Sequence, residues 1–130
     1  MTTMLYLWIG IGSALGGMAR YWTNGVMVRL LGGMFPWGTM AVNILGCSFI
    51  GWFTVITGSG GRWVAPFSVR AFVMTGICGG YTTFSTFSLD TLNLARDGAW
   101  MRAALNILGS LVFCLLGVWL GHAVAAWQTR

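Results

Sequence analysis

The sequence predicts an all-α membrane protein whose four transmembrane helices form a single domain over residues 1–130. Hydrophobic residues make up 57% of the chain and charged residues only 7%, and the mean hydropathy is +0.78. A water-soluble protein of this size would need more polar side chains to cover its surface. Crossing the hydrocarbon core takes about 20 mostly apolar residues per helix, so four crossings use nearly the whole chain.

Glycine, proline and charged residues divide the chain into four apolar stretches. The spans are expected at about residues 4–31, 37–57, 64–95 and 100–127. Turn-forming residues occupy the connections: Gly32, Gly33 and Pro36 in the first, residues 58–62 with Pro66 in the second, and residues 96–98 in the third. No Lys or Arg precedes the first stretch, which is also too long for the apolar part of a signal peptide, so we expect it to remain as a helix.

The charged residues are seven arginines and two aspartates, which give a formal charge of +5. The arginines are scattered, so we interpret them as anchors at the membrane interfaces and expect no nucleic-acid binding. With four spans, the second loop and both termini share one side of the membrane. That side carries Arg62, Arg70 and Arg130, and the opposite side carries Arg29, Arg96 and Arg102. Equal counts specify orientation poorly, which hints at dual topology and an antiparallel partner.

The third span contains an unusual segment, residues 76–88, which reads Gly-Ile-Cys-Gly-Gly-Tyr-Thr-Thr-Phe-Ser-Thr-Phe-Ser. Gly79 and Gly80 weaken a helix, and the hydroxyl run after them is typical of the cap of a new helix, so we expect a break. Backbone groups freed at bilayer depth must be satisfied by protein or by a polar cavity. They could attract an anion to the new helix N-terminus, or hold Na⁺ through free carbonyls. The alternative is a glycine-packed helix whose hydroxyls bond to carbonyls one turn back.

Two pairs of residues at helical spacing have two possible roles each. Phe84 and Phe87 share a helix face, where the rings either pack or direct their positive edges at a dehydrated anion. Thr39 and Asn43 share a face of the second span, and Asn43 either bonds across a helix interface or donates to a permeating anion.

The remaining polar residues within the spans suggest a path. Asn106, Ser110 and Cys114 follow each other at steps of four and form a polar line along the fourth helix. Arg20 lies deep in the first span, where it either lines a vestibule that attracts anions or extends to the membrane interface. Asp90 is expected to have a structural role, pairing with an arginine or capping a backbone group.

Neither a metal site nor an enzyme is suggested by the other reactive side chains. Cys47, Cys78 and Cys114 have no CxxC spacing and are odd in number, so we expect them to be small buried apolar residues. His122 has no matching Ser and Asp, and there is no nucleophile elbow, zinc-spaced His pair or P-loop.

Residues 38–43, Gly-Thr-Met-Ala-Val-Asn, and residues 79–88, Gly-Gly-Tyr-Thr-Thr-Phe-Ser-Thr-Phe-Ser, resemble the signature segments of the Fluc (CrcB) fluoride channels. The size of the chain, its four spans and its balanced arginines agree with that family. The resemblance implies a fluoride-selective channel that exports fluoride passively across the bacterial plasma (inner) membrane. It also implies an antiparallel, dual-topology homodimer with two pores and a structural Na⁺ at the dimer axis.

The resemblance further implies a role for individual residues. The fluoride pore would contain Phe84, Phe87, Asn43, Thr39, Ser110 and Asn106. Arg20 would lie in the aqueous vestibule, and the backbone carbonyls of Gly79 and Thr82 would hold the Na⁺. Cys114 departs from the pattern, because a hydroxyl would be favoured there. The assignment agrees with the physics of fluoride, which is small and strongly hydrated, so a pore must replace its water with several fixed donors.

Two other classes of protein share some of these features. A small dual-topology, proton-coupled multidrug antiporter has a similar length and helix count, but it works through a carboxylate deep in its first helix. This chain has no glutamate, and its two aspartates, Asp90 and Asp97, lie late in the third span or in a loop. An accessory subunit without transport would leave the polar residues in mid-membrane without a purpose.

Overall fold

The computed structural model describes residues 2–130, which form four helical columns. Three columns are the single helices α1 (Thr2–Leu31), α2 (Trp37–Ile56) and α6 (Trp100–Gln128). The remaining column consists of α3 (Phe67–Arg70), the π-helix η1 (Ala71–Cys78), α4 (Gly79–Tyr81) and α5 (Phe84–Arg96). The columns agree closely with the four predicted spans, which confirms the all-helical prediction.

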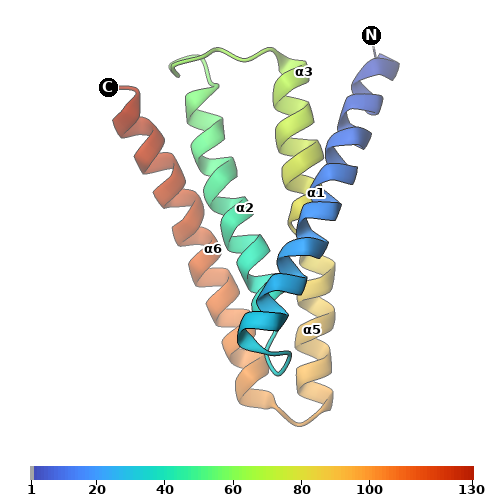
Figure 1. The fold of residues 1–130 in the computed structure, drawn as a ribbon. Coiled ribbons are helices and arrows are strands. Elements are labelled where there is room, and N and C mark those ends of the chain that lie inside the picture. The colour runs from blue at the N-terminus through green and yellow to red at the C-terminus, as the bar shows by residue number, and fades with distance from the viewer. Residues whose placement is uncertain (1) are drawn as a thin grey trace.

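Both termini and the connection from α2 to α3 lie at one end of the molecule, and the other two connections lie at the opposite end (Figure 1). Gly32 and Gly98 close α1 and α5 with φ values of +80° and +74°, a conformation that favours glycine. The arginines therefore divide as expected between the two ends. One end carries Arg62, Arg70 and Arg130, and the other carries Arg29, Arg96 and Arg102 (Figure 1).

Helices α2 and α6 are each long and apolar enough to cross a membrane. They pack side by side through glycines (Figure 1). A Cβ at Gly121 would lie 2.0 Å from Ser48 O, and one at Gly51 would lie 2.3 Å from Val118 O. Among residues 2–130, neither α1 nor the third column contains a single helix that is both long and apolar enough to cross a membrane by this measure. The third column is divided into short pieces, and α1 carries Arg20 and many small or polar residues.

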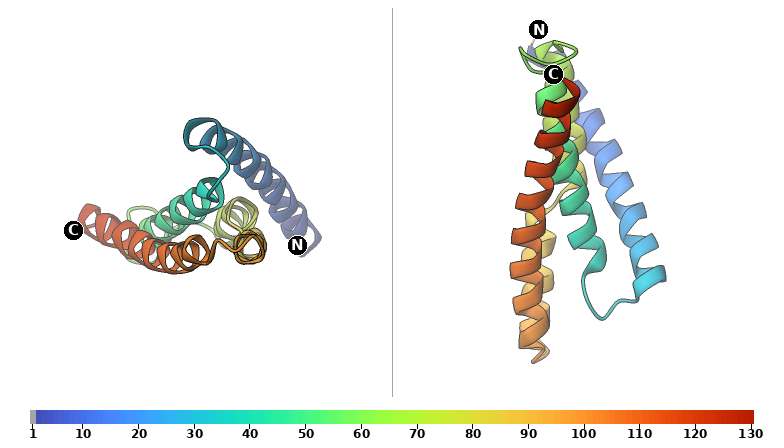
Figure 2. Two further views of the ribbon diagram at one scale, coloured as in Figure 1. Left: turned by 90° about the horizontal axis from the view of Figure 1, so that it is seen from below. Right: turned by 90° about the vertical axis from the view of Figure 1, so that its left-hand side faces the viewer.

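Helix α1 crosses the third column through small residues and then diverges from the other columns toward its C-terminal end (Figure 2). A Cβ would lie 2.7 Å from Phe72 O at Gly12, 2.2 Å from Ile77 O at Gly16, and 2.4 Å from Ser13 O at Gly80. These positions have room for glycine only, because the two backbones touch there.

The predicted break in the third span is confirmed, but its position differs from the prediction. Gly79 and Gly80 remain helical, and the chain becomes extended at Thr82 (φ −82°, ψ 159°) and Thr83 (φ −155°, ψ 119°). The physical reason is that Gly80 serves the close contact with α1 and does not interrupt the helix. The π-helix before the break was not predicted. Such widened turns occur often at functional sites.

Candidate functional site

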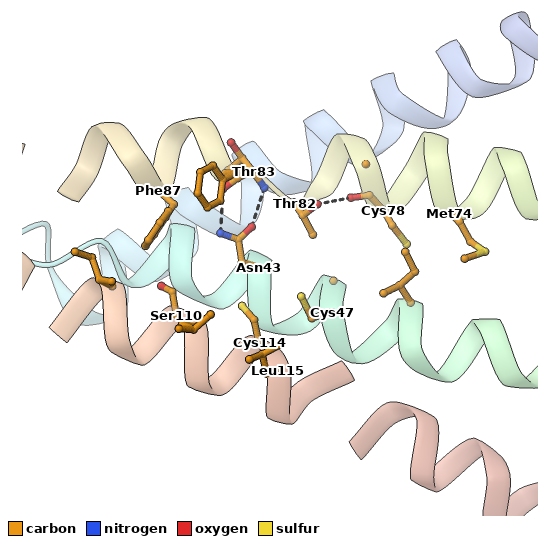
Figure 3. Close-up of a pocket in the computed structure, with 16 residues that line it drawn as sticks. Asn43, Cys47, Met74, Cys78, Thr82, Thr83, Phe87, Ser110, Cys114 and Leu115 are labelled. Carbon is orange, nitrogen blue, oxygen red and sulfur yellow. Dashed lines mark hydrogen bonds between the residues drawn. The ribbon is translucent and has the colours of Figure 1, made fainter. Parts of the chain in front are cut away.

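The side chain of Asn43 holds the break in place. Its Nδ2 donates to Thr83 O at 3.0 Å, and the Thr83 N–H donates to Asn43 Oδ1 at 2.7 Å (Figure 3). One carboxamide thus satisfies both backbone groups of a residue that lies outside a helix. Of the two roles considered for Asn43, the structure shows the bond across a helix interface. The second N–H of the amide remains for another acceptor.

Thr83 also begins the helix that follows. Its Oγ1 accepts a hydrogen bond from the Thr86 N–H at 3.1 Å, so Thr83 is the N-cap of α5. This confirms that the hydroxyl run caps a new helix. The N-terminus of α5, with its partial positive charge, consequently lies at the break.

Carbonyl groups at the break, among them those of Gly79 and Thr82, lack their helical partners. Because the Thr83 N–H donates to Asn43, it does not complete the helical bond to Gly79 O. Thr82 O accepts a hydrogen bond from Arg20 Nη1 at 3.3 Å. The Arg20 side chain therefore points toward the break.

A pocket of about 590 Å³ lies beside the break, between α2, α6 and the third column. Its walls are mostly apolar and include Phe84 and Phe87, whose ring centroids are 5.3 Å apart. Phe84 is 79% exposed in the single chain. Ser110 also lines the pocket, and its buried Oγ has no hydrogen-bond partner among the described residues. The pocket thus brings together two aromatic rings, an amide and a hydroxyl without a partner among the described residues.

Two predicted site residues lie away from this pocket. Thr39 donates to Asp90 Oδ2 at 2.7 Å and lines a second pocket, toward the end of the molecule that carries residues 97–99. Asn106 is completely buried, and its Nδ2 donates to Thr91 Oγ1 at 2.9 Å. Asp90 thus has a structural role, as expected, but the partner that the structure shows is the Thr39 hydroxyl and not an arginine or a backbone group.

The cysteines differ from their expected role as buried packing residues. All three line the pocket at the break, and only Cys78, at 4% exposure, is buried. Cys47 and Cys114 are half-buried and face the pocket (Figure 3). Helical spacing already placed Cys114 in line with Ser110, and the same spacing could have placed Cys47 in line with Asn43, four residues before it. Asn24 was not among the predicted site residues, although its buried Oδ1 has no partner among the described residues.

The two long apolar helices, the broken helix and the pocket beside it, which contains a few polar groups, form an all-helical arrangement typical of membrane channels and transporters. The chain belongs to the CrcB-like protein, Camphor Resistance (CrcB) family, whose model matches residues 7–122. The family resemblance of residues 38–43 and 79–88 is thereby confirmed.

Similar proteins match over almost their whole length. A fluoride-specific ion channel FluC of Methylocella silvestris is 59% identical over 122 residues, covering 94% of this chain and 93% of the relative. The proteins of the same name from Opitutus terrae and Paramagnetospirillum magneticum are 52% and 49% identical. These two alignments cover 93% and 94% of this chain, and 92% and 95% of the relatives.

Proposed function

We propose that this protein is a fluoride-selective channel that lets fluoride leave the cell passively across the bacterial inner membrane. The relatives named fluoride-specific ion channels support this proposal, because they share about half or more of their residues with nearly the whole chain. The pocket at the break, and not an enzymatic centre, is where we place the function.

The observation that carries the proposal is the unpartnered Ser110 Oγ beside the two phenylalanine rings. A pore for fluoride must replace a tightly held hydration shell with several fixed donors. The Ser110 hydroxyl and the second N–H of Asn43 are such donors, and the edges of Phe84 and Phe87 carry partial positive charge. None of these groups is a full cation, so the ion is not held too tightly to leave.

The other predicted site residues, Thr39, Asn106 and Arg20, lie outside the pocket at the break in this proposal. Thr39 and Asn106 lie further along the anion path, where their bonds to Asp90 and Thr91 join α5 to α2 and α6. Arg20 provides the positive charge of a vestibule on the α1 side of the break. A charge in such a place raises the local concentration of anions without entering the narrow part of the path.

The functional unit in this proposal is an antiparallel homodimer with two pores. The 79% exposure of Phe84, a proposed pore residue, supports a second chain, since one subunit leaves that wall open to the lipid. The roughly equal arginine counts at the two ends fit a chain that inserts in both orientations.

A Na⁺ at the dimer axis fits the groups that are present. The carbonyls of Gly79 and Thr82 are freed by the break, although Thr82 O also accepts from Arg20. Two carbonyls are too few to replace the water around a hard cation, so the same pair from a second chain is required. When bound, Na⁺ would supply a fixed positive charge that ties the two broken helices together.

Ion efflux from liposomes that contain the purified protein tests this proposal. We expect rapid fluoride release without a proton gradient, read with a fluoride electrode, while chloride in parallel liposomes is retained. Fluoride release that occurs only with an opposing proton gradient would indicate a coupled transporter instead of a channel. No release from a folded dimer would refute transport and favour an accessory subunit.

A further inference from the structure

The pocket at the break is rich in sulfur. All three cysteines of the chain line it, together with Met74. Cys47 on α2 and Cys114 on α6 line the pocket from two helices that pack together, and Figure 3 draws their side chains near each other. Cys78 lies on the opposite wall, on η1, and is buried. The half-buried pair is therefore the part of this cluster that an ion in the pocket can reach.

We propose that Cys47 and Cys114 form a binding site for a soft monovalent cation of the Ag⁺ or Cu⁺ class, and that its occupation blocks the anion path. Thiolates select soft cations over the hard ions that oxygen ligands prefer. Two neighbouring thiols on two tightly packed helices supply a pair of such ligands at a fixed separation. The effect on transport rests on the proposed channel function, whereas the binding itself does not.

The chemistry of binding explains the block. Each thiol loses its proton to water, two S–H bonds break, and two sulfur–metal bonds form to one cation without any change of oxidation state. Two thiolates and one monovalent cation carry a net charge of −1. None of the described residues that line the pocket is charged, so a new negative charge there is weakly compensated. A permeating anion is then repelled as well as sterically hindered.

Fluoride efflux in the presence of Ag⁺ tests the block. The probe is silver nitrate in chloride-free nitrate buffer, applied to liposomes with the wild type, Cys47→Ser, Cys114→Ser or Cys78→Ser. Each variant is compared with its own untreated efflux. We expect Ag⁺ to slow efflux by about ten-fold or more in the wild type and in Cys78→Ser. We expect little change in the other two variants, and recovery of the wild type when dithiothreitol removes the metal.

A binding measurement keeps the site testable even if the protein transports nothing. Protein in detergent is mixed with Ag⁺, passed over a desalting column containing free histidine as a mild competitor, and analysed for silver by mass spectrometry. Cys78→Ser should retain one Ag⁺ per chain, and Cys47→Ser and Cys114→Ser should each lose that ion. Retention that depends on Cys78 but on neither member of the pair would overturn the proposal, as would no retention at all.

A second measurement uses the wild-type protein, so that it tests the site even if the serine variants misfold. Ag⁺ should protect Cys47 and Cys114 together from labelling by a maleimide, with the labelled positions mapped by peptide mass spectrometry. Equal labelling of both cysteines with and without Ag⁺ would contradict the site.

Discussion

At the scale of single residues, Asn43 links two parts of the chain that the sequence does not place together. Its amide pairs with both backbone groups of Thr83, so the extended residue at the break is fully bonded inside the protein. In a membrane, a backbone group without such a partner is costly because no water is available to replace it.

Replacing Asn43 by Ala leaves two backbone groups of Thr83 without partners. We expect the free energy of unfolding to fall by about 2–6 kcal/mol, because each of the two unsatisfied buried groups usually costs about 1–3 kcal/mol. Thermal unfolding in detergent measures this, with Asn93→Ala as the control, because Asn93 is exposed on α5. Equal melting temperatures for Asn43→Ala and the wild type would contradict the role assigned to the amide.

The sequence could predict that Asn43 and Ser110 need partners, because polar side chains in a span are costly. It could not predict that Asn43 has its partner in Thr83 while the Ser110 hydroxyl stays free. Helical spacing gives the face on which a side chain lies, but not the residue on the neighbouring helix. For the same reason, the sequence predicts that Thr39 shares a helix face with Asn43, but it does not predict that Thr39 donates to Asp90.

At the scale of elements, glycine explains why a break in the third span was correctly predicted and why it was placed at the wrong residues. A glycine pair indicates either a weak point in a helix or a close approach of two backbones. At Gly80 the second property applies, because α1 occupies the space where a side chain would lie. The break occurs at the two threonines that follow, where Asn43 and the Thr83 hydroxyl satisfy the backbone.

Two neighbouring glycines of α1 provide a matched test of this packing. A Cβ at Gly16 would lie 2.2 Å from Ile77 O and 2.8 Å from Tyr81 N, whereas Gly17 has nothing within 4 Å. We expect Gly16→Ala to lower the free energy of unfolding by about 1–3 kcal/mol through overpacking. Gly17→Ala should be neutral, or stabilising by up to about 1 kcal/mol through helix propensity. If unfolding in detergent gave the opposite order, the contact between α1 and the third column would be wrong.

At the scale of the whole molecule, the proposed channel would need more than one chain to enclose the anion path. Phe84 is exposed, and many large apolar side chains cover the outer faces of the helices. An antiparallel partner would close the path, and such a pair requires chains in both orientations. Balanced arginines at the two ends are the feature of the sequence that would allow this.

Added arginines should therefore fix the orientation. Ser59→Arg with Gly60→Arg places two charges on an exposed loop, where a Cβ added at Gly60 would meet nothing within 4 Å. We expect C-terminal reporter fusions of the wild type to be active on both sides of the membrane, and those of this variant only on the cytoplasmic side. Fluoride efflux from cells should fall with this variant alone.

Co-expression completes the orientation experiment. A second variant, Gly33→Arg with Met34→Arg, adds charge to the exposed connection at the opposite end. Together, the two oppositely biased variants should restore efflux. If the first variant alone transported fluoride as well as the wild type does, the antiparallel dimer would be refuted.

The most direct test of the central claim, that the pocket at the break is the path of the anion, is fluoride efflux from liposomes containing Phe84→Ile. Phe67→Ile serves as the control, since Phe67 is exposed at the start of α3 and away from the pocket. We predict that Phe84→Ile elutes as a folded dimer with efflux at least about ten-fold slower, a change of roughly 1.4 kcal/mol. We predict that Phe67→Ile transports like the wild type. Wild-type efflux through folded Phe84→Ile would contradict the account.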